Sequence, residues 1–108
     1  MHKRLLVAAL LLVAPALWAG LPEGTVWIDV RSAEEFSEGH LEGAILIPHD
    51  EIDAGIRKLD LSPDTPIYLY CRSGRRAGMA RDRLHELKYN TVINVGGIDD
   101  ARRLTGQD

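Results

Sequence analysis

The sequence has very little cysteine: Cys71 is the only one among its 108 residues. A lone cysteine excludes an internal disulfide. Three arginines and a glycine follow it within five positions, namely Arg72, Gly74, Arg75 and Arg76. A guanidinium group keeps its positive charge and favours a nearby anion. The pattern therefore predicts a reactive thiolate, and the alternative is an inert thiol buried in the core.

Long hydrophobic runs are also scarce. The apolar stretch at residues 5–18 is shorter than the roughly 20 residues that cross a bilayer, and Pro15 interrupts it. Lys3 and Arg4 precede this stretch, and small residues follow it. This order of basic, apolar and small residues is typical of a secretory signal peptide.

Cleavage of this signal would set the domain boundary and the location. It is predicted after Ala16 or after Ala19, and we favour Ala19 because Gly20 follows it. Residues 1–19 would then be the signal peptide, and residues 20–108 would form one exported domain. The predicted location is the periplasm, with no stable membrane association after cleavage. The alternative is an uncleaved membrane anchor.

An excess of positive charge is missing as well. The chain carries a net charge of −3, and loss of Lys3 and Arg4 with the signal leaves −5. We expect no nucleic-acid partner, because only one loop of this acidic domain is basic. The hydrophobic share of 45% and the charged share of 27% are ordinary for one soluble domain with one core. We expect a monomer, since no helical pattern leaves a long apolar face exposed.

Short apolar runs alternate with helical patterns along the exported part. The runs lie at residues 25–30, 44–47, 67–70 and 91–95, and they predict four short strands. Apolar residues at helical spacing follow these runs. Strands that alternate with helices favour an α/β domain with a central, mostly parallel sheet flanked by helices.

Local signals define the ends of these helices. Ser32 and Glu35 have the spacing of a capping box, which predicts a helix start at Ser32. We expect Phe36 of that helix to face the core and Asp50 to cap the next helix. Asn90 is the candidate for a left-handed residue that ends the third helix.

Two polar motifs are interpreted as structural rather than catalytic. Asp29 and Arg31 alternate at the end of a predicted strand, so both side chains lie on one face and an ion pair is expected. His40 lies beside a glycine and is expected to bond the backbone within a turn.

The cysteine lies where a strand ends and a helix begins. The first N–H groups of a helix lack intrahelical partners and attract an anion. Gly74 permits the positive φ that brings successive N–H groups onto one surface, which would lower the thiol pKa of Cys71. Since the helix dipole contributes only about 0.3–1 kcal/mol, we expect at least one arginine to face the sulfur. The predicted substrate-binding residues are Arg72, Ser73, Gly74, Arg75 and Arg76. Arg75 and Arg76 are the main candidates, and the alternative for Arg72 is that it points outward to a partner.

Several motifs stand in the order and spacing of one family. They are Asp29-Val30-Arg31 with Glu35-Phe36, Gly39-His40-Leu41 through Ile47-Pro48, Cys71-Arg72-Ser73-Gly74-Arg75-Arg76, and Val95-Gly96-Gly97-Ile98. With these motifs the chain resembles the rhodanese family. In size and export signal it is similar to the single-domain periplasmic members of the phage-shock type. The resemblance implies a three-layer rhodanese-like domain.

The resemblance also implies a reaction. Cys71 would attack the outer sulfur of thiosulfate, release sulfite and hold the sulfur as a persulfide, which a thiophilic acceptor such as cyanide or a thiol removes. No metal and no organic cofactor is expected. The alternative is a sulfur carrier that receives its sulfur from a partner protein. A related phosphatase is disfavoured, because such enzymes place an arginine six residues after the cysteine, where Ala77 stands here.

The signal sequence makes a prediction that one mass spectrum tests. Protein expressed in a Gram-negative host should appear in the periplasmic fraction without residues 1–19, or without residues 1–16 if the other site is used. Intact mass spectrometry distinguishes the two products. Full-length protein in the membrane fraction would contradict cleavage and favour the anchor.

Overall fold

The computed structural model describes residues 20–107. The expected signal peptide at residues 1–19 lies outside this part of the chain, so it stays a prediction. None of the helices between residues 20 and 107 combines the length and the hydropathy that a membrane span requires.

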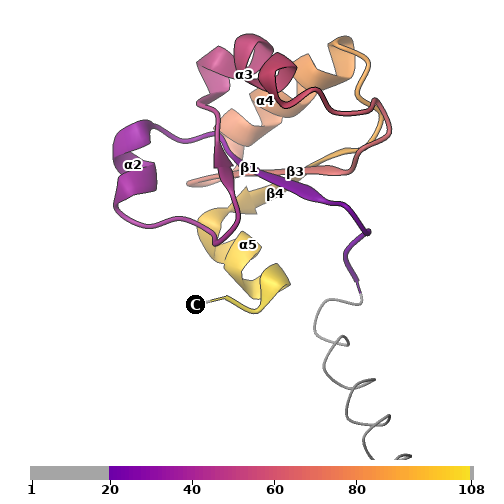
Figure 1. Ribbon diagram of the computed structural model, residues 1–108. Helices are drawn as coiled ribbons and strands as arrows, with labels where there is room; N and C mark the ends of the chain where they lie inside the picture. Colours follow the sequence, from indigo (N-terminus) through magenta and orange to yellow (C-terminus); the bar gives the residue numbers. More distant parts are fainter. Residues whose placement is uncertain (1–19, 108) are drawn as a thin grey trace, which may run out of the picture.

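The described residues form one sheet of four parallel strands at the centre of the domain (Figure 1). The strands are β1 (Val26–Asp29), β2 (Ile45–Leu46), β3 (Ile67–Cys71) and β4 (Val92–Gly97). Their order across the sheet is β2-β1-β3-β4. The predicted strands and their parallel arrangement are therefore confirmed.

Helices cover both faces of the sheet and complete three layers. α3 (Ile52–Leu59) and α4 (Arg75–Glu86) lie on one face, and α5 (Ile98–Thr105) lies on the other (Figure 1). The 3-10 turn η2 (His49–Glu51) leads into α3. The short helix α2 (Ala33–Ser37) lies beyond one end of the sheet, where the strands finish. This is the expected three-layer α/β architecture.

The core consists of two apolar clusters, one on each face of the sheet. The larger cluster lies between the sheet and the α3–α4 layer and includes Leu69 and Cys71 of β3. The smaller cluster lies on the α5 side and contains Tyr70, Leu41 and Ala101. Because side chains alternate along a strand, Cys71 faces the N-terminus of α4 while its neighbour Tyr70 faces the opposite layer.

α2 begins as predicted but buries less than expected. The Ser32 hydroxyl accepts the N–H of Glu35 at 3.1 Å, and the Glu35 carboxylate accepts the N–H of Ser32 at 3.0 Å, so the capping box is confirmed. The prediction that Phe36 faces the core is wrong. It is half-buried, and its ring stacks on His40 with centroids 3.6 Å apart, because this five-residue helix lies beyond the sheet. The same histidine bonds the Phe36 carbonyl through Nδ1 at 2.8 Å, which confirms the turn role.

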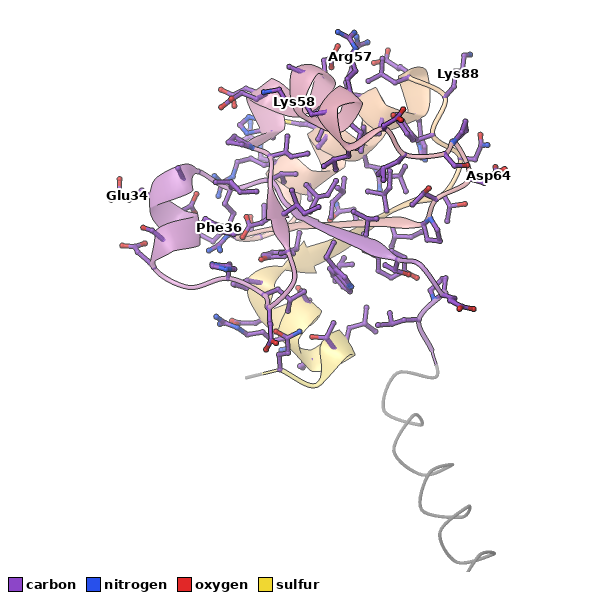
Figure 2. The ribbon with its side chains drawn as sticks, viewed as in Figure 1. Glu34, Phe36, Arg57, Lys58, Asp64 and Lys88 are labelled. Carbon is purple, nitrogen blue, oxygen red and sulfur yellow. The ribbon has the colours of Figure 1, made fainter. Side chains whose placement is uncertain are left out.

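Two predicted helix ends also differ. Asp50 lies inside the 3-10 turn and makes no capping bond. Lys88, rather than Asn90, adopts the left-handed conformation after α4, with φ of 75°. Asn90 is held elsewhere: its N–H donates to the Pro63 carbonyl at 2.9 Å and its side chain donates to Asp64 at 2.8 Å. The loop before β3 therefore holds Asn90 by two hydrogen bonds, and the left-handed turn after α4 falls at Lys88 instead. Figure 2 shows Lys88 and Asp64 projecting from this end of the domain.

A buried ion pair holds the carboxyl end of β1. The guanidinium of Arg31 lies 2.7 Å from the carboxylate of Asp29, which has no exposed surface. The same guanidinium donates to the Gly39 carbonyl at 2.7 Å and lies 5.7 Å from the ring centre of Tyr70. The Tyr70 hydroxyl in turn accepts the N–H of Leu41 at 2.9 Å. The predicted ion pair is confirmed, and it joins β1 to the turn after α2.

Replacement of Arg31 should destabilise the domain severely. Arg31→Met leaves the Asp29 carboxylate buried without its cationic partner, and we expect it to lower the free energy of unfolding by about 3 kcal/mol or more. Urea denaturation measures the loss. The control is Arg81→Met, which removes an exposed pair with Asp82 and should cost at most about 1 kcal/mol. Equal losses in both variants would contradict a structural role for the buried pair.

Candidate functional site

Cys71 is the last residue of β3, and α4 begins four residues later. Its side chain is only 1% exposed, yet it faces the loop: the N–H of Gly74 donates to Cys71 Sγ at 2.9 Å. Gly74 has a φ of 98°, a left-handed conformation that side chains rarely adopt. The predicted strand-to-helix placement and the positive φ are confirmed. The cysteine is buried, as the alternative reading held, but it is directed at hydrogen-bond donors.

Peptide groups dominate the electrostatics of the sulfur. Burial raises the pKa of the Cys71 thiol, but hydrogen bonds from backbone N–H groups outweigh the effect of burial, so the pKa is lowered. These N–H groups belong to Ala77, Ser73, Gly74 and Arg76. Hydrogen bonds to the charged form favour that form. The sequence suggested that a guanidinium must provide much of this effect. In the structure the backbone of the loop provides it, because the loop surrounds the sulfur with N–H donors.

Arg76 is the loop arginine whose guanidinium is held in a fixed place. Its guanidinium makes a two-pronged ion pair with Glu35 of α2, with N–O distances of 2.7 and 3.0 Å. The pKa of Arg76 is raised, first by these hydrogen bonds and in smaller part by the charge on Cys71. The charge on Cys71 thus acts on Arg76, and the expectation that an arginine faces the sulfur stays a prediction. The charge of Arg76 is shared with a carboxylate, a partner that sequence reasoning did not assign.

The remaining arginines lie at the rim of the loop. Arg72 and Arg75 are exposed, and neither forms an ion pair within residues 20–107. Arg72 helps to line a cleft of about 480 Å³ between α2 and the start of α5. Its cleft partners include Glu38 and Asp99. Arg72 and Arg75 are thus the accessible cations of the loop, and the exposed Ser73 lies between Cys71 and Gly74.

Residues of β4 pack against the backbone of the loop and donate a hydrogen bond to it. A Cβ atom at Gly97 would lie 2.4 Å from the carbonyl oxygen of Arg72, so the two backbones approach too closely for any larger residue. Asn94 donates through Nδ2 to the Gly74 carbonyl at 2.9 Å. The sequence indicated the glycines as part of a motif, but no signal in it indicated Asn94. Only the pairing of β3 with β4 brings this side chain to the loop.

Metal ligation is not supported in the described part of the chain. Between residues 20 and 107, no group of three or more histidine, cysteine or acidic side chains is placed to hold a metal ion. The site is thus a single thiol, a ring of N–H donors and nearby guanidinium groups.

Together, the fold and the site define an α/β protein with a cysteine that accepts a loop N–H between a parallel strand and the N-terminus of a helix. More specifically, the chain belongs to the Rhodanese-like domain family, whose profile matches residues 13–103. This establishes the family that the sequence motifs suggested.

Individual relatives agree with this assignment. The chain is 37% identical over 91 residues to the thiosulfate sulfurtransferase PspE of Escherichia coli strain K12, covering 82% of this chain and 88% of that protein. It is also 37% identical over 80 residues to a putative sulfur carrier protein, YrkF of Bacillus subtilis strain 168, covering 74% of this chain but 41% of that longer protein. Among solved structures, a rhodanese with anions from E. coli superposes with a TM-score of 0.67 at 37% identity, covering 70% of this chain and 89% of that one.

The ion pair between Arg76 and Glu35 predicts a contribution to stability that is lost in acid. The hydrogen bonds from Arg76, and then that from the Ser32 N–H, lower the pKa of Glu35 to about 2 from an ordinary value of 4.5. A lowered pKa means that the ionised form stabilises the fold. This contribution is complete above pH 4.5 and is lost as the pH falls through 2.

Glu35→Gln should therefore lower the free energy of unfolding by about 1 kcal/mol at pH 7, discounted for partial exposure. The difference from wild type should shrink between pH 4.5 and pH 2. Denaturant titrations at several pH values measure it. The control is Glu34→Gln, whose side chain points to solvent on the same helix (Figure 2). A Glu35→Gln penalty that is constant with pH would refute the electrostatic explanation.

Proposed function

We propose that this protein is a thiosulfate sulfurtransferase that carries sulfur as a persulfide on Cys71. The observation that supports this most directly is the convergence of loop N–H groups on Sγ, which lowers the pKa of the thiol. The thiolate is the nucleophilic form of cysteine. The name of the E. coli relative, a thiosulfate sulfurtransferase, points to the same chemistry.

In the first step the Cys71 thiolate attacks the outer sulfur of thiosulfate. A bond forms between Sγ and that sulfur, the sulfur–sulfur bond of thiosulfate breaks, and its electron pair leaves with sulfite. The product is a persulfide anion on Cys71, so charge and atoms balance. The outer sulfur of the persulfide lies about 2.0 Å beyond Sγ. The same N–H groups then stabilise its negative charge.

In the second step an acceptor removes the sulfur. Cyanide attacks the outer sulfur, the bond to Sγ breaks, and thiocyanate leaves while the Cys71 thiolate is restored. A thiol acceptor reacts in the same way and becomes a persulfide itself. Because Cys71 is the only cysteine of the chain, the acceptor comes from outside it. The two displacements share one covalent intermediate, which divides the transfer into easier steps.

The substrate-binding role falls to the loop. Thiosulfate is a dianion, and we propose that Arg72 and Arg75 bind its sulfonate end, because both guanidinium groups belong to exposed residues of the loop. Arg76 contributes less directly, because Glu35 occupies two of its N–H groups. The Ser73 and Gly74 N–H groups serve the sulfur. The proposed site thus comprises Cys71 and the five residues that follow it.

A second candidate function is sulfur carriage for a partner protein. The observation that favours it is the low exposure of Cys71, at 1%, since a buried persulfide is protected from small oxidants and thiols. One relative is described as a putative sulfur carrier protein. In this case the protein isolated from cells would carry a persulfide but turn over thiosulfate very slowly.

The proposal also includes export. Removal of residues 1–19 would place a monomeric enzyme in the periplasm, where thiosulfate and other small sulfur anions are its substrates. The basic, apolar and small residues at the start of the sequence support this part of the proposal.

Purified protein should produce thiocyanate from thiosulfate and cyanide, and Cys71→Ala should abolish this activity to the background rate. Mass spectrometry should show a gain of about 32 Da after thiosulfate and its loss after cyanide. The colorimetric assay of thiocyanate gives the rates. Arg81→Ala, at an exposed position farther along α4, is a control that should keep full activity.

Two results would oppose the main proposal. Turnover equal to that of Cys71→Ala would exclude thiosulfate as the donor. A stable gain of 32 Da on protein isolated from cells, combined with that absence of turnover, would favour the carrier function instead.

A further inference from the structure

We propose that Asn94 is a positioning residue that holds the Gly74 peptide, so that the N–H groups of the loop converge on Cys71 Sγ. This inference rests on the proposed function of Cys71 as the sulfur-carrying group. Asn94 lies 23 residues after the cysteine in the sequence and has no contact with Sγ of its own among the hydrogen bonds of the described residues. Its effect therefore passes through the loop.

The register of the sheet brings Asn94 to this position. Leu69 pairs with Asn94, but the next residue, Tyr70, pairs with Gly96, so Val95 is an extra residue in β4. Such a bulge bends a strand and redirects its side chains. It also allows Gly97 to pair with Cys71 at the end of the ladder. The irregularity thus lies directly beside the end of β3 from which the loop departs.

The side chain of Asn94 joins this bulge to the loop. Its Oδ1 accepts the N–H of Gly96 at 2.9 Å, and its Nδ2 donates to the carbonyl of Gly74 at 2.9 Å. A Cβ atom at Gly78, in the first turn of α4, would lie 3.4 Å from Nδ2, so the amide packs closely under the helix. One side chain therefore ties together the bulge, the loop and the start of α4.

An amide is the group that this position requires. The Gly96 N–H is only a donor and the Gly74 carbonyl is only an acceptor, so the side chain needs one acceptor and one donor at fixed places. A carboxylate at position 94 keeps the bond to Gly96 but faces the Gly74 carbonyl with a second oxygen. An alanine loses both bonds. The two substitutions therefore separate the support of the bulge from the support of the loop.

The Gly74 carbonyl accepts two hydrogen bonds, and Asn94 donates only one of them. It also accepts the N–H of Gly78 at 2.9 Å, which is the first hydrogen bond of α4. Together the two donors fix the plane of the peptide between Gly74 and Arg75. This fixes the start of the helix relative to β3, and with it the N–H groups of Gly74 and Arg76 that face the sulfur.

Charged groups around the sulfur come from other elements. Arg76 of α4 is paired with Glu35 of α2, and Asp100 of α5 accepts the N–H of Gly97 at 2.8 Å. Within β4 the one polar side chain is the neutral amide of Asn94, which bonds the loop at Gly74. Asn94→Asp would thus add a negative charge on this side, and a negative charge opposes the thiolate.

The single cysteine makes a direct test possible. Protein treated with a reductant to remove bound sulfur is alkylated with iodoacetamide between pH 4 and pH 9, and the rate is followed by mass spectrometry. Every adduct reports on Cys71, since no other thiol is present. We expect Asn94→Ala and Asn94→Asp to move the midpoint of the rate profile to higher pH, with the larger shift for aspartate. At pH 6.5 both should react about threefold or more slowly than wild type.

The matched control is Asn90→Ala. The Asn90 side chain bonds Asp64 at 2.8 Å at the far end of α4 and should leave the midpoint unchanged. In the thiosulfate assay, the Asn94 variants should lose rate while Asn90→Ala keeps it. A shifted alkylation midpoint without any thiosulfate turnover in wild type would preserve the role of Asn94 and remove the proposed function.

Two outcomes would overturn the inference. One is a pair of folded Asn94 variants whose alkylation profiles match wild type. The other is unfolding of both variants, as judged by circular dichroism and urea denaturation, because Asn94 would then support the fold as a whole. Asn94→Asp retains the bond to Gly96 and is the variant designed to stay folded.

Discussion

The electrostatics of the site depend on hydrogen bonds from peptide N–H groups to one sulfur atom. Cys71 lies at the boundary between the larger apolar cluster and the start of α4, where burial by itself would keep the thiol neutral. Loop N–H groups, among them that of Gly74 at 2.9 Å, outweigh the effect of burial and lower the pKa of the thiol. A loop can present several donors to one atom only if its backbone turns sharply, which the positive φ of Gly74 permits. The rest of the structure fixes that turn in place.

Two elements from distant parts of the chain hold the loop. From one side, α2 presents Glu35, whose carboxylate both caps its own helix and binds Arg76. From the other side, β4 supplies a glycine that lets the Arg72 backbone approach closely, and the Asn94 amide that bonds Gly74. The buried pair of Asp29 and Arg31 anchors the turn after α2 and so fixes the place of that helix. Preorganised donors of this kind need no rearrangement when charge develops on the sulfur.

The backbone and the side chains of the loop have different roles in this arrangement. Backbone N–H groups donate to the sulfur, as the bond from Gly74 at 2.9 Å shows. The guanidinium groups of Arg72 and Arg75 remain at the surface, where they can meet an anionic donor. Membership of the Rhodanese-like domain family, and the likeness to a protein named as a thiosulfate sulfurtransferase, agree with such a site. If Cys71 carries sulfur as proposed, the sulfur must pass to another molecule, because the sequence has no second thiol.

Local patterns in the sequence determined the elements that depend on neighbouring residues. The four strands, the capping box at Ser32, the strand-to-helix placement of Cys71 and the positive φ of Gly74 all follow from residues a few positions apart. Contacts between distant segments were decided only by the tertiary structure. Glu35 and Arg76 are 41 residues apart and Asn94 lies 20 residues beyond Gly74, so their meeting depends on how the strands pair and where the bulge falls. The half-exposed Phe36 has the same cause, because an apolar residue in a helical pattern is buried only if another layer lies opposite it, and α2 extends beyond the sheet.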